Sequence, residues 1–75
     1  MKRIIDGLLY DTDTSTLIHK EEDTKKRLFK TPNNNFFMLY ATGEFVVKNE
    51  SNVKDYLGMN NVEKYIELFG EPQEA

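Results

Sequence analysis

The chain has 75 residues, with ten Lys or Arg against thirteen Asp or Glu, and a formal net charge of −3. This length makes one domain whose core is near the lower limit for independent folding. The absence of cysteine excludes disulfide bonds, cysteine-ligated zinc sites and a thiol nucleophile. No apolar run approaches the roughly 20 residues that span a bilayer, and the apolar pair after Met1-Lys2-Arg3 is too short for a signal peptide. We therefore expect a cytoplasmic protein.

The first local signal is Asp6-Gly7, which stands between two apolar pairs. Both central residues of a type I′ turn need positive φ, and Asp-Gly adopts that conformation readily. The sequence thus predicts a hairpin that pairs Ile5 with Leu8 and Arg3 with Tyr10.

Four strand candidates follow a Ser-, Thr- and Asp-rich turn, over residues 16–19, 25–31, 36–41 and 45–47. A tight turn at 32–35 would place Thr31 opposite Phe36 and Phe29 opposite Met38. One face of this central hairpin would then carry Arg27, Phe29, Phe36, Met38 and Tyr40. The other face would carry Lys26, Leu28, Lys30, Phe37, Leu39 and Ala41.

Two helical segments are expected near the C-terminus. Ser51 can cap a short turn of helix that Gly58 ends. Asn60 or Asn61 then caps a final helix, which Gly70 stops. The apolar stripe of this final helix has the spacing i, i+3, i+4 and i+7 and consists of Val62, Tyr65, Ile66 and Phe69.

The predicted architecture is a single α+β domain over residues 1–70 with a frayed tail at 71–75. A small antiparallel sheet built from hairpins is closed by the C-terminal amphipathic helix. Because one helix covers one face of a sheet, the other face is expected to stay open and to contact a second chain, either a copy in a homodimer or another protein. That open face would carry Leu28, Phe37 and Leu39, with Lys26 and Lys30 at its margin.

Residues after the first hairpin match the spacing of positions 1, 3, 5, 8 and 12 of an EF-hand calcium loop. The matching positions are Asp11, Asp13, Ser15, Ile18 and Glu22. The position that requires glycine is Thr16, a β-branched residue that disfavours positive φ. A hairpin also precedes the loop where an EF-hand has a helix. We therefore interpret the segment as a turn and predict no metal site.

The polar residues form no catalytic constellation. His19 is the only histidine, and neither Ser15 nor Ser51 is flanked by the glycines of a nucleophile elbow. The four glycines are scattered and make no phosphate loop. Adjacent carboxylates such as Glu21-Glu22 are usually solvated. We predict that the protein is not an enzyme and that it binds no cofactor.

Cations and aromatic residues interleave in Lys25-Lys26-Arg27-x-Phe29-Lys30 and Phe36-Phe37-x-x-Tyr40. Single-stranded nucleic acid binds surfaces of this kind. The glycine of the RRM signature is missing, and the net charge adds no attraction. The favoured interpretation places these aromatic residues in the core. A small nucleic-acid-binding accessory protein that uses the Lys25–Tyr40 hairpin remains the alternative.

Carboxylates recur every three or four residues on the side of the final helix opposite its apolar stripe, at Glu63, Glu67, Glu71 and Glu74. An acidic ridge of this kind can occupy a basic groove that normally holds phosphates. An ordinary solvated helix face is the competing interpretation.

The opening Lys2-x-Ile4-Ile5-x-Gly7-x-x-Tyr10-Asp11-Thr12-x-Thr14 resembles a family of small proteins carried by phages and mobile elements of Gram-positive bacteria. Residues 28–38 resemble its aromatic hairpin, and the closing helix lies where the family has an acidic one. Asn34 stands where the family has glycine in the hairpin turn, and Tyr40 and Thr42 replace glycines of its next segment. A role of that glycine-rich segment therefore does not carry over to this chain.

This resemblance implies that the protein belongs to a phage or mobile element and acts inside a host bacterium. Small phage proteins without active sites often bind and block a host machine, and several anti-CRISPR proteins are acidic mimics of nucleic acid. We therefore expect a protein that inhibits a host defence protein, such as a CRISPR effector, in the bacterial cytoplasm. A self-assembling element is a further hypothesis. The expected partner-binding residues are Lys26, Leu28, Lys30, Phe37, Leu39, Glu63 and Glu67.

Overall fold

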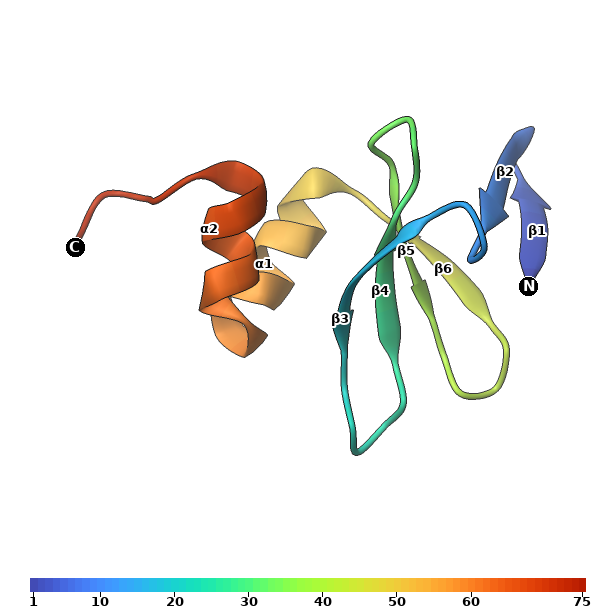
Figure 1. Cartoon of the computed structure of the whole chain (residues 1–75), viewed down its shortest axis with the longest axis horizontal. Helices are drawn as coiled ribbons and strands as arrows, with labels where there is room; N and C mark the ends of the chain where they lie inside the picture. The colour runs from blue at the N-terminus through green and yellow to red at the C-terminus, as the bar shows by residue number, and fades with distance from the viewer.

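The computed structural model describes residues 1–75 (Figure 1). Its elements are β1 (Lys2–Ile5), β2 (Leu8–Asp11), β3 (Thr16–Lys20), β4 (Arg27–Lys30), β5 (Phe36–Leu39), β6 (Phe45–Lys48), α1 (Glu50–Asn60) and α2 (Val62–Phe69). β1 and β2 pair in a two-stranded sheet, and β3 to β6 form a four-stranded antiparallel sheet in chain order. The predicted α+β class, with hairpin-built sheets and a C-terminal helix, is confirmed.

The first hairpin has the predicted register. Ile5 lies opposite Leu8, and Arg3 lies opposite Tyr10. The turn residues Asp6-Gly7 have φ of 51° and 77°, as a type I′ turn requires.

The β4–β5 hairpin has a different register from the predicted one. Phe29 lies opposite Phe37, and Lys30 lies opposite Phe36. The turn is one residue tighter than expected, because the predicted register encloses four residues, whereas the bond that the Thr31 N–H donates to the Asn35 carbonyl at 2.8 Å encloses three. The last of these, Asn34, has φ of 65°, which closes the turn in the left-handed conformation.

This one-residue shift moves side chains between faces of the sheet. Leu28 shares its face with Met38, its partner in the register, whereas Phe37 and Leu39 lie on the opposite face. The predicted grouping of Leu28 with Phe37 and Leu39 is therefore wrong.

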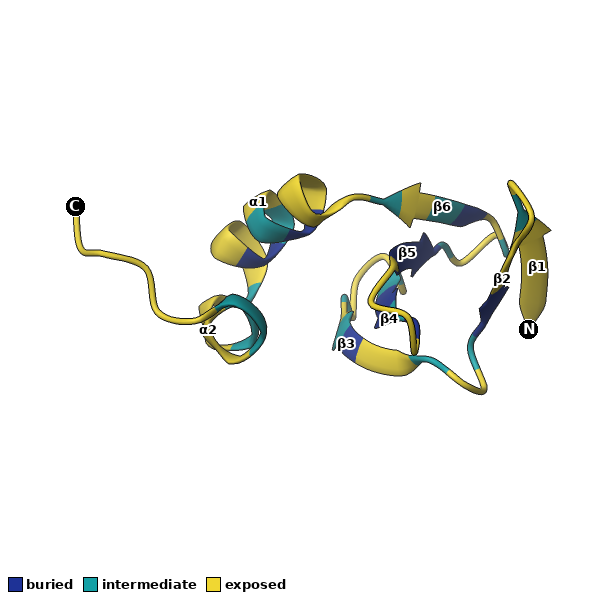
Figure 2. Ribbon diagram, turned by 90° about the horizontal axis from the view of Figure 1, so that it is seen from above, coloured by how far each residue is buried: buried dark blue, intermediate teal, exposed yellow.

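Both faces of the four-stranded sheet are covered, so the predicted open face is also wrong. The β1–β2 hairpin lies against one face and the helices lie against the other (Figures 1 and 2). Leu28 and Leu39 are each 1% exposed, and Phe37 is 0% exposed.

The hairpin side of the sheet has an aromatic core. Its buried members are Tyr10, Phe29, Phe37, Leu39 and Phe45. The Phe37 ring stacks between those of Phe29 and Phe45, with centroid distances of 5.0 and 5.3 Å, and Tyr10 meets it edge-on at 5.5 Å. Tyr10 comes from β2, so the N-terminal hairpin completes this core.

The helix side of the sheet is closed chiefly by α1. Val53 and Leu57 are buried there against a cluster from the sheet made of Ile18, Leu28, Phe36 and Met38. The predicted boundaries of this helix are wrong at both ends. Asn49, and not Ser51, is its N-cap, with its side chain and that of Asn52 each accepting from the other's main-chain N–H. Gly58 lies inside the helix and does not end it.

The final helix begins after Asn61 and ends at Gly70, both as predicted. Its contact with the core differs from the predicted stripe. The side chains of α2 that pack on the helix-side cluster are Tyr65, Leu68 and Phe69, while Val62 and Ile66 are exposed. α2 therefore caps the edge of a core that α1 has already closed. Residues 71–75 are exposed and have no regular structure.

Candidate functional site

α2 carries the candidate binding surface. None of its residues is buried, and Val62 and Ile66 are 58% and 37% exposed. These two apolar side chains lie one turn apart, and Glu63 and Glu67 follow them with the same spacing. We call Val62, Glu63, Ile66 and Glu67 the outer surface of α2. Figure 2 shows α2 with exposed residues on the side away from the sheet.

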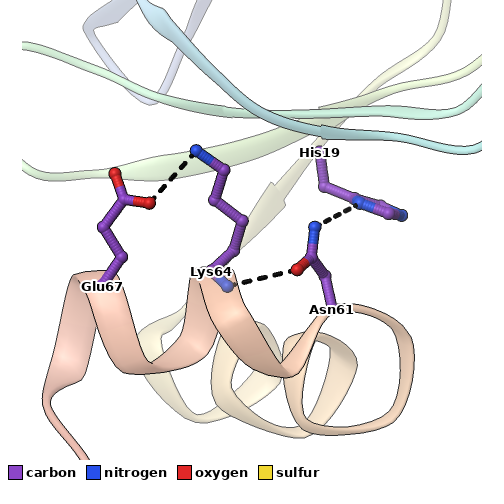
Figure 3. Close-up of polar contacts among 4 residues, drawn as sticks. All are labelled: His19, Asn61, Lys64 and Glu67. Atoms are coloured by element: carbon purple, nitrogen blue, oxygen red, sulfur yellow. Dashed lines mark hydrogen bonds and ion pairs between the residues drawn. The ribbon is translucent and has the colours of Figure 1, made fainter.

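Asn61 fixes the start of α2 and its position on the sheet (Figure 3). Its side-chain oxygen accepts from the Lys64 N–H at 3.1 Å, and its amide nitrogen lies 3.1 Å from His19 Nδ1. An amide nitrogen can only donate, so this contact is a hydrogen bond in the tautomer whose Nδ1 is the acceptor. The cap of α2 is thereby bound to β3. The sequence predicts the cap, whereas no local pattern reveals its second partner 42 positions away.

An ion pair orders part of the outer surface. The Lys64 ammonium lies 3.3 Å from the Glu67 carboxylate, one turn along α2 (Figure 3). Glu67 is largely exposed and Lys64 is partly exposed, so solvent screens this pair and it contributes little to stability. Glu63 forms no ion pair, so its carboxylate is available to a partner.

A second polar contact joins α1 to the loop between β3 and β4. The Tyr56 hydroxyl donates to the Glu21 carboxylate, which also accepts from the Thr24 hydroxyl at 2.9 Å. These two bonds, with Tyr56 the larger influence, hold the pKa of Glu21 below its ordinary value. The pKa of Tyr56 is raised, most strongly by burial and less strongly by the hydrogen bond to the Glu21 carboxylate and its negative charge. Both groups are committed to each other, an arrangement that leaves neither as a free base or nucleophile.

The other predicted site residues are dispersed. Lys26 is half-buried, and its ammonium lies 5.5 Å from the centre of the Tyr40 ring. Lys30 lies at the opposite end of β4, in a cleft that Phe69 also lines. The structure thus keeps Glu63 and Glu67 together and separates Lys26 from Lys30.

The segment that resembled a calcium loop is a turn followed by a strand. The Asp13 N–H donates to the Asp11 carboxylate at 3.0 Å, and the Ser15 N–H donates to the Asp11 carbonyl at 3.1 Å. β3 then separates Asp11 from Glu22 by about 16 Å of extended chain. Glu22 instead contacts Lys25 at 3.8 Å. Nowhere in the molecule do three His, Asp or Glu side chains gather closely enough to hold a metal ion.

No protein-family model, no curated protein and no solved structure matches this chain. The resemblance to the phage and mobile-element family therefore stays a prediction. Neither helix is long and apolar enough to cross a membrane.

Proposed function

We propose that this protein is a non-enzymatic binding protein that inhibits a host defence machine through protein–protein contact, made by the outer surface of α2. The observation that carries the proposal is the exposure of Val62 and Ile66 beside Glu63 and Glu67, on a helix with no buried residue. Two neighbouring apolar side chains on one exposed helix face are anchors for a groove in a partner.

The chemistry of this surface defines the partner. Apolar anchors require an apolar floor, and the adjacent carboxylates require Lys or Arg at the rim. Grooves that combine these features occur where a protein holds nucleic acid, because positive charge there attracts phosphates. CRISPR effectors hold their guide–target duplex in such a positively charged channel. An acidic helix that enters the channel would exclude the nucleic acid.

The charge distribution of the chain supports this assignment. Residues 50–75 carry six Asp or Glu against two Lys or Arg, while the rest of the chain has a net charge of +1. Acidic charge is therefore concentrated on the helices and the tail. The sequence resemblance to phage and mobile-element proteins supports the same class of function and supports a proposed location in the cytoplasm of a bacterial host.

Because both faces of the four-stranded sheet are covered, its buried side chains are excluded as a contact surface. Phe37 and Leu39 lie inside the aromatic core, so they are not available to a partner. Their burial removes the reason to expect a homodimer through this face. The outer surface of α2 keeps its exposure in the folded monomer.

Plasmid protection in bacterial cells would test the proposal. One strain carries a CRISPR effector directed at a plasmid, and a second strain carries a restriction enzyme that cuts the same plasmid. Expression of this protein should restore transformation by at least tenfold in one of the two strains. Purified effector should then be captured by the protein in the absence of nucleic acid.

The contact surface is tested by matched charge reversals. Glu63→Lys combined with Glu67→Lys should abolish protection, whereas Glu71→Lys combined with Glu74→Lys makes the same change in net charge within the tail and should preserve it. Ile66→Ser should weaken protection as well. Failure to protect in both strains would overturn the proposed function. Equal loss from both double variants would overturn the assignment to α2.

A further inference from the structure

The edge of the four-stranded sheet at β6 has no partner strand. The two edges of this sheet are β3 and β6, and they differ. The β3–β4 register is interrupted by a bulge between Leu17 and His19, which protects that edge from further pairing. The β5–β6 register runs without a shift, and β6 contains no proline. β6 lies at the margin of the sheet (Figure 2) and is the edge that can accept another strand.

Main-chain groups of Phe45 and Val47 point out of this edge. The Tyr40 N–H donates to the Glu44 carbonyl at 2.9 Å, so these two residues form a hydrogen-bonded pair of the β5–β6 ladder. Such pairs alternate with non-bonded pairs along antiparallel strands, and the next residue of β6 that bonds to β5 is Val46. The N–H and C=O groups of Phe45 and Val47 therefore face away from β5, where a neighbouring strand would lie.

The same edge carries one anionic and one cationic side chain. Glu44 immediately precedes β6 and Lys48 ends it, and neither forms an ion pair. Because side chains alternate along a strand, Glu44, Val46 and Lys48 share the helix side of the sheet. Phe45 and Val47 are on the hairpin side, where Phe45 is buried and Val47 is 45% exposed. The edge thus has opposite charges at its two ends and β-branched residues between them.

We propose that two copies of this protein pair through β6, antiparallel and with Val46 on the two-fold axis. In this register Phe45 of each copy lies opposite Val47 of the other, and the outward N–H and C=O groups bond to one another. Glu44 of each copy lies opposite Lys48 of the other. These are the non-hydrogen-bonded positions of the new ladder, where opposite side chains approach most closely. The two sheets become one continuous antiparallel sheet.

Self-complementarity selects a second copy as the occupant of this edge. A foreign strand would need a basic and an acidic residue at the spacing of Glu44 and Lys48, whereas a second copy has them by symmetry. A shift of one residue would oppose groups that already bond to β5. A shift of two would bring Gly43, with φ of 92°, or the helix cap Asn49 into the ladder. The pairing therefore has one register.

The pairing is closed and independent of the outer surface of α2. A two-fold axis uses the β6 edge of both copies, and the bulged β3 edge does not continue the sheet, so assembly stops at a dimer. The inference does not rest on the proposed function, because the β6 edge and the outer surface of α2 share no residue.

Sedimentation equilibrium of the full chain tests the pairing. An interface made by one strand edge is smaller than the roughly 1,200 Å² of stable complexes, so we expect a dimer at protein concentrations of about 0.1–1 mM. Glu44→Lys alone, or Lys48→Glu alone, sets like charges opposite each other and should weaken dimerisation at least tenfold. An equimolar mixture of the two variants should restore association, because one chain then carries two cations at these positions and the other carries two carboxylates.

A matched control makes the same reversals in the loop between β3 and β4, with Glu22→Lys and Lys25→Glu, and each of these should dimerise like the unmodified protein. Amide hydrogen exchange locates the contact. The N–H groups of Phe45 and Val47 should exchange at least threefold more slowly at about 1 mM than at about 10 μM, whereas that of Val46 should not change.

Three results would overturn the proposal. One is a monomer throughout this concentration range. Another is a dimer that the control reversals weaken as much as Glu44→Lys does. The third is a mixture of Glu44→Lys and Lys48→Glu that associates no better than either variant alone, with thermal unfolding verifying that both are folded.

Discussion

The Tyr56 hydroxyl donates a hydrogen bond to the Glu21 carboxylate across 35 positions of sequence. Tyr56 also meets the His19 ring edge-on, with the ring centres 5.8 Å apart. His19 in turn binds Asn61 at the start of α2. Both helices are therefore tied to the same end of the sheet by polar contacts, in addition to the apolar packing of Val53 and Leu57.

Tyr56→Phe should lower the free energy of unfolding by about 1 kcal/mol, because it removes a hydrogen bond to a charged but partly solvated group. In a domain of this size the melting temperature should fall by roughly 4–8 °C. Tyr65→Phe is the matched control, since Tyr65 packs against the same cluster and its hydroxyl has no partner. Urea denaturation measures both variants, and an equal effect from the two would contradict the role of this bond.

The same bond predicts a pH dependence. The pKa of Glu21 is held below its ordinary value of 4.5, chiefly by the Tyr56 hydroxyl. The folded state thus favours the ionised form, and this contribution is present above the unfolded-state pKa and lost as pH falls through the folded-state pKa. The difference in stability between the unmodified protein and Tyr56→Phe should therefore shrink between neutral pH and a pH of about 3. A difference that stayed constant over this range would argue against an ionised Glu21 as the acceptor.

Local signals predicted the elements of this fold better than their arrangement. Asp6-Gly7 and Gly70 each impose a backbone conformation on their own neighbours, so the sequence locates the first turn and the last helix end. The register of β4 and β5 depends on whether the Asn-rich turn encloses three residues or four. An alternating strand pattern tolerates either register when both faces are half apolar. The error grouped Phe37 and Leu39 with Leu28, although they share a face with Phe29.

The covering of the second sheet face could not be predicted from the sequence pattern of any single element. Tyr10 belongs to a hairpin that looks complete by itself, yet its ring closes the core around Phe37. The pairing of Lys20 with Arg27 likewise arises only when β3 and β4 come together in the sheet. Glu63 and Glu67 were predictable, since their spacing lies within one helix.

Substitutions at Asn34 test the three-residue turn between β4 and β5. The φ of 65° at Asn34 is costly for most residues and free of strain for glycine. Asn34→Gly should leave the free energy of unfolding within about 0.5 kcal/mol, whereas Asn34→Val should lower it by about 1–2 kcal/mol. Asn33→Val is the control, because Asn33 does not have positive φ. If valine is tolerated equally at both positions in thermal denaturation, the turn does not have this geometry.

Phe37→Ala tests whether the second face is closed. The side chain is fully buried between two other aromatic rings, so its removal should cost about 3–5 kcal/mol. Such a loss is a large part of the total stability of a small domain. Ile4→Ala provides the contrast, since Ile4 is 72% exposed on the outer side of the hairpin, and should change stability by less than about 0.5 kcal/mol.

Phe37→Ala and Ile4→Ala together distinguish a residue in the core from a residue on a contact surface. A residue on an open face would lose partner binding and keep its stability when truncated. We expect Phe37→Ala to lower the urea midpoint strongly and to increase binding of an apolar dye, while Ile4→Ala does neither. Phe37→Leu keeps most of the buried volume and should remain folded, so protection of plasmids by this variant should match that of the unmodified protein. If the Phe37→Ala variant were stable and failed to protect, the sheet face that carries Phe37 would be a binding surface and not a closed core.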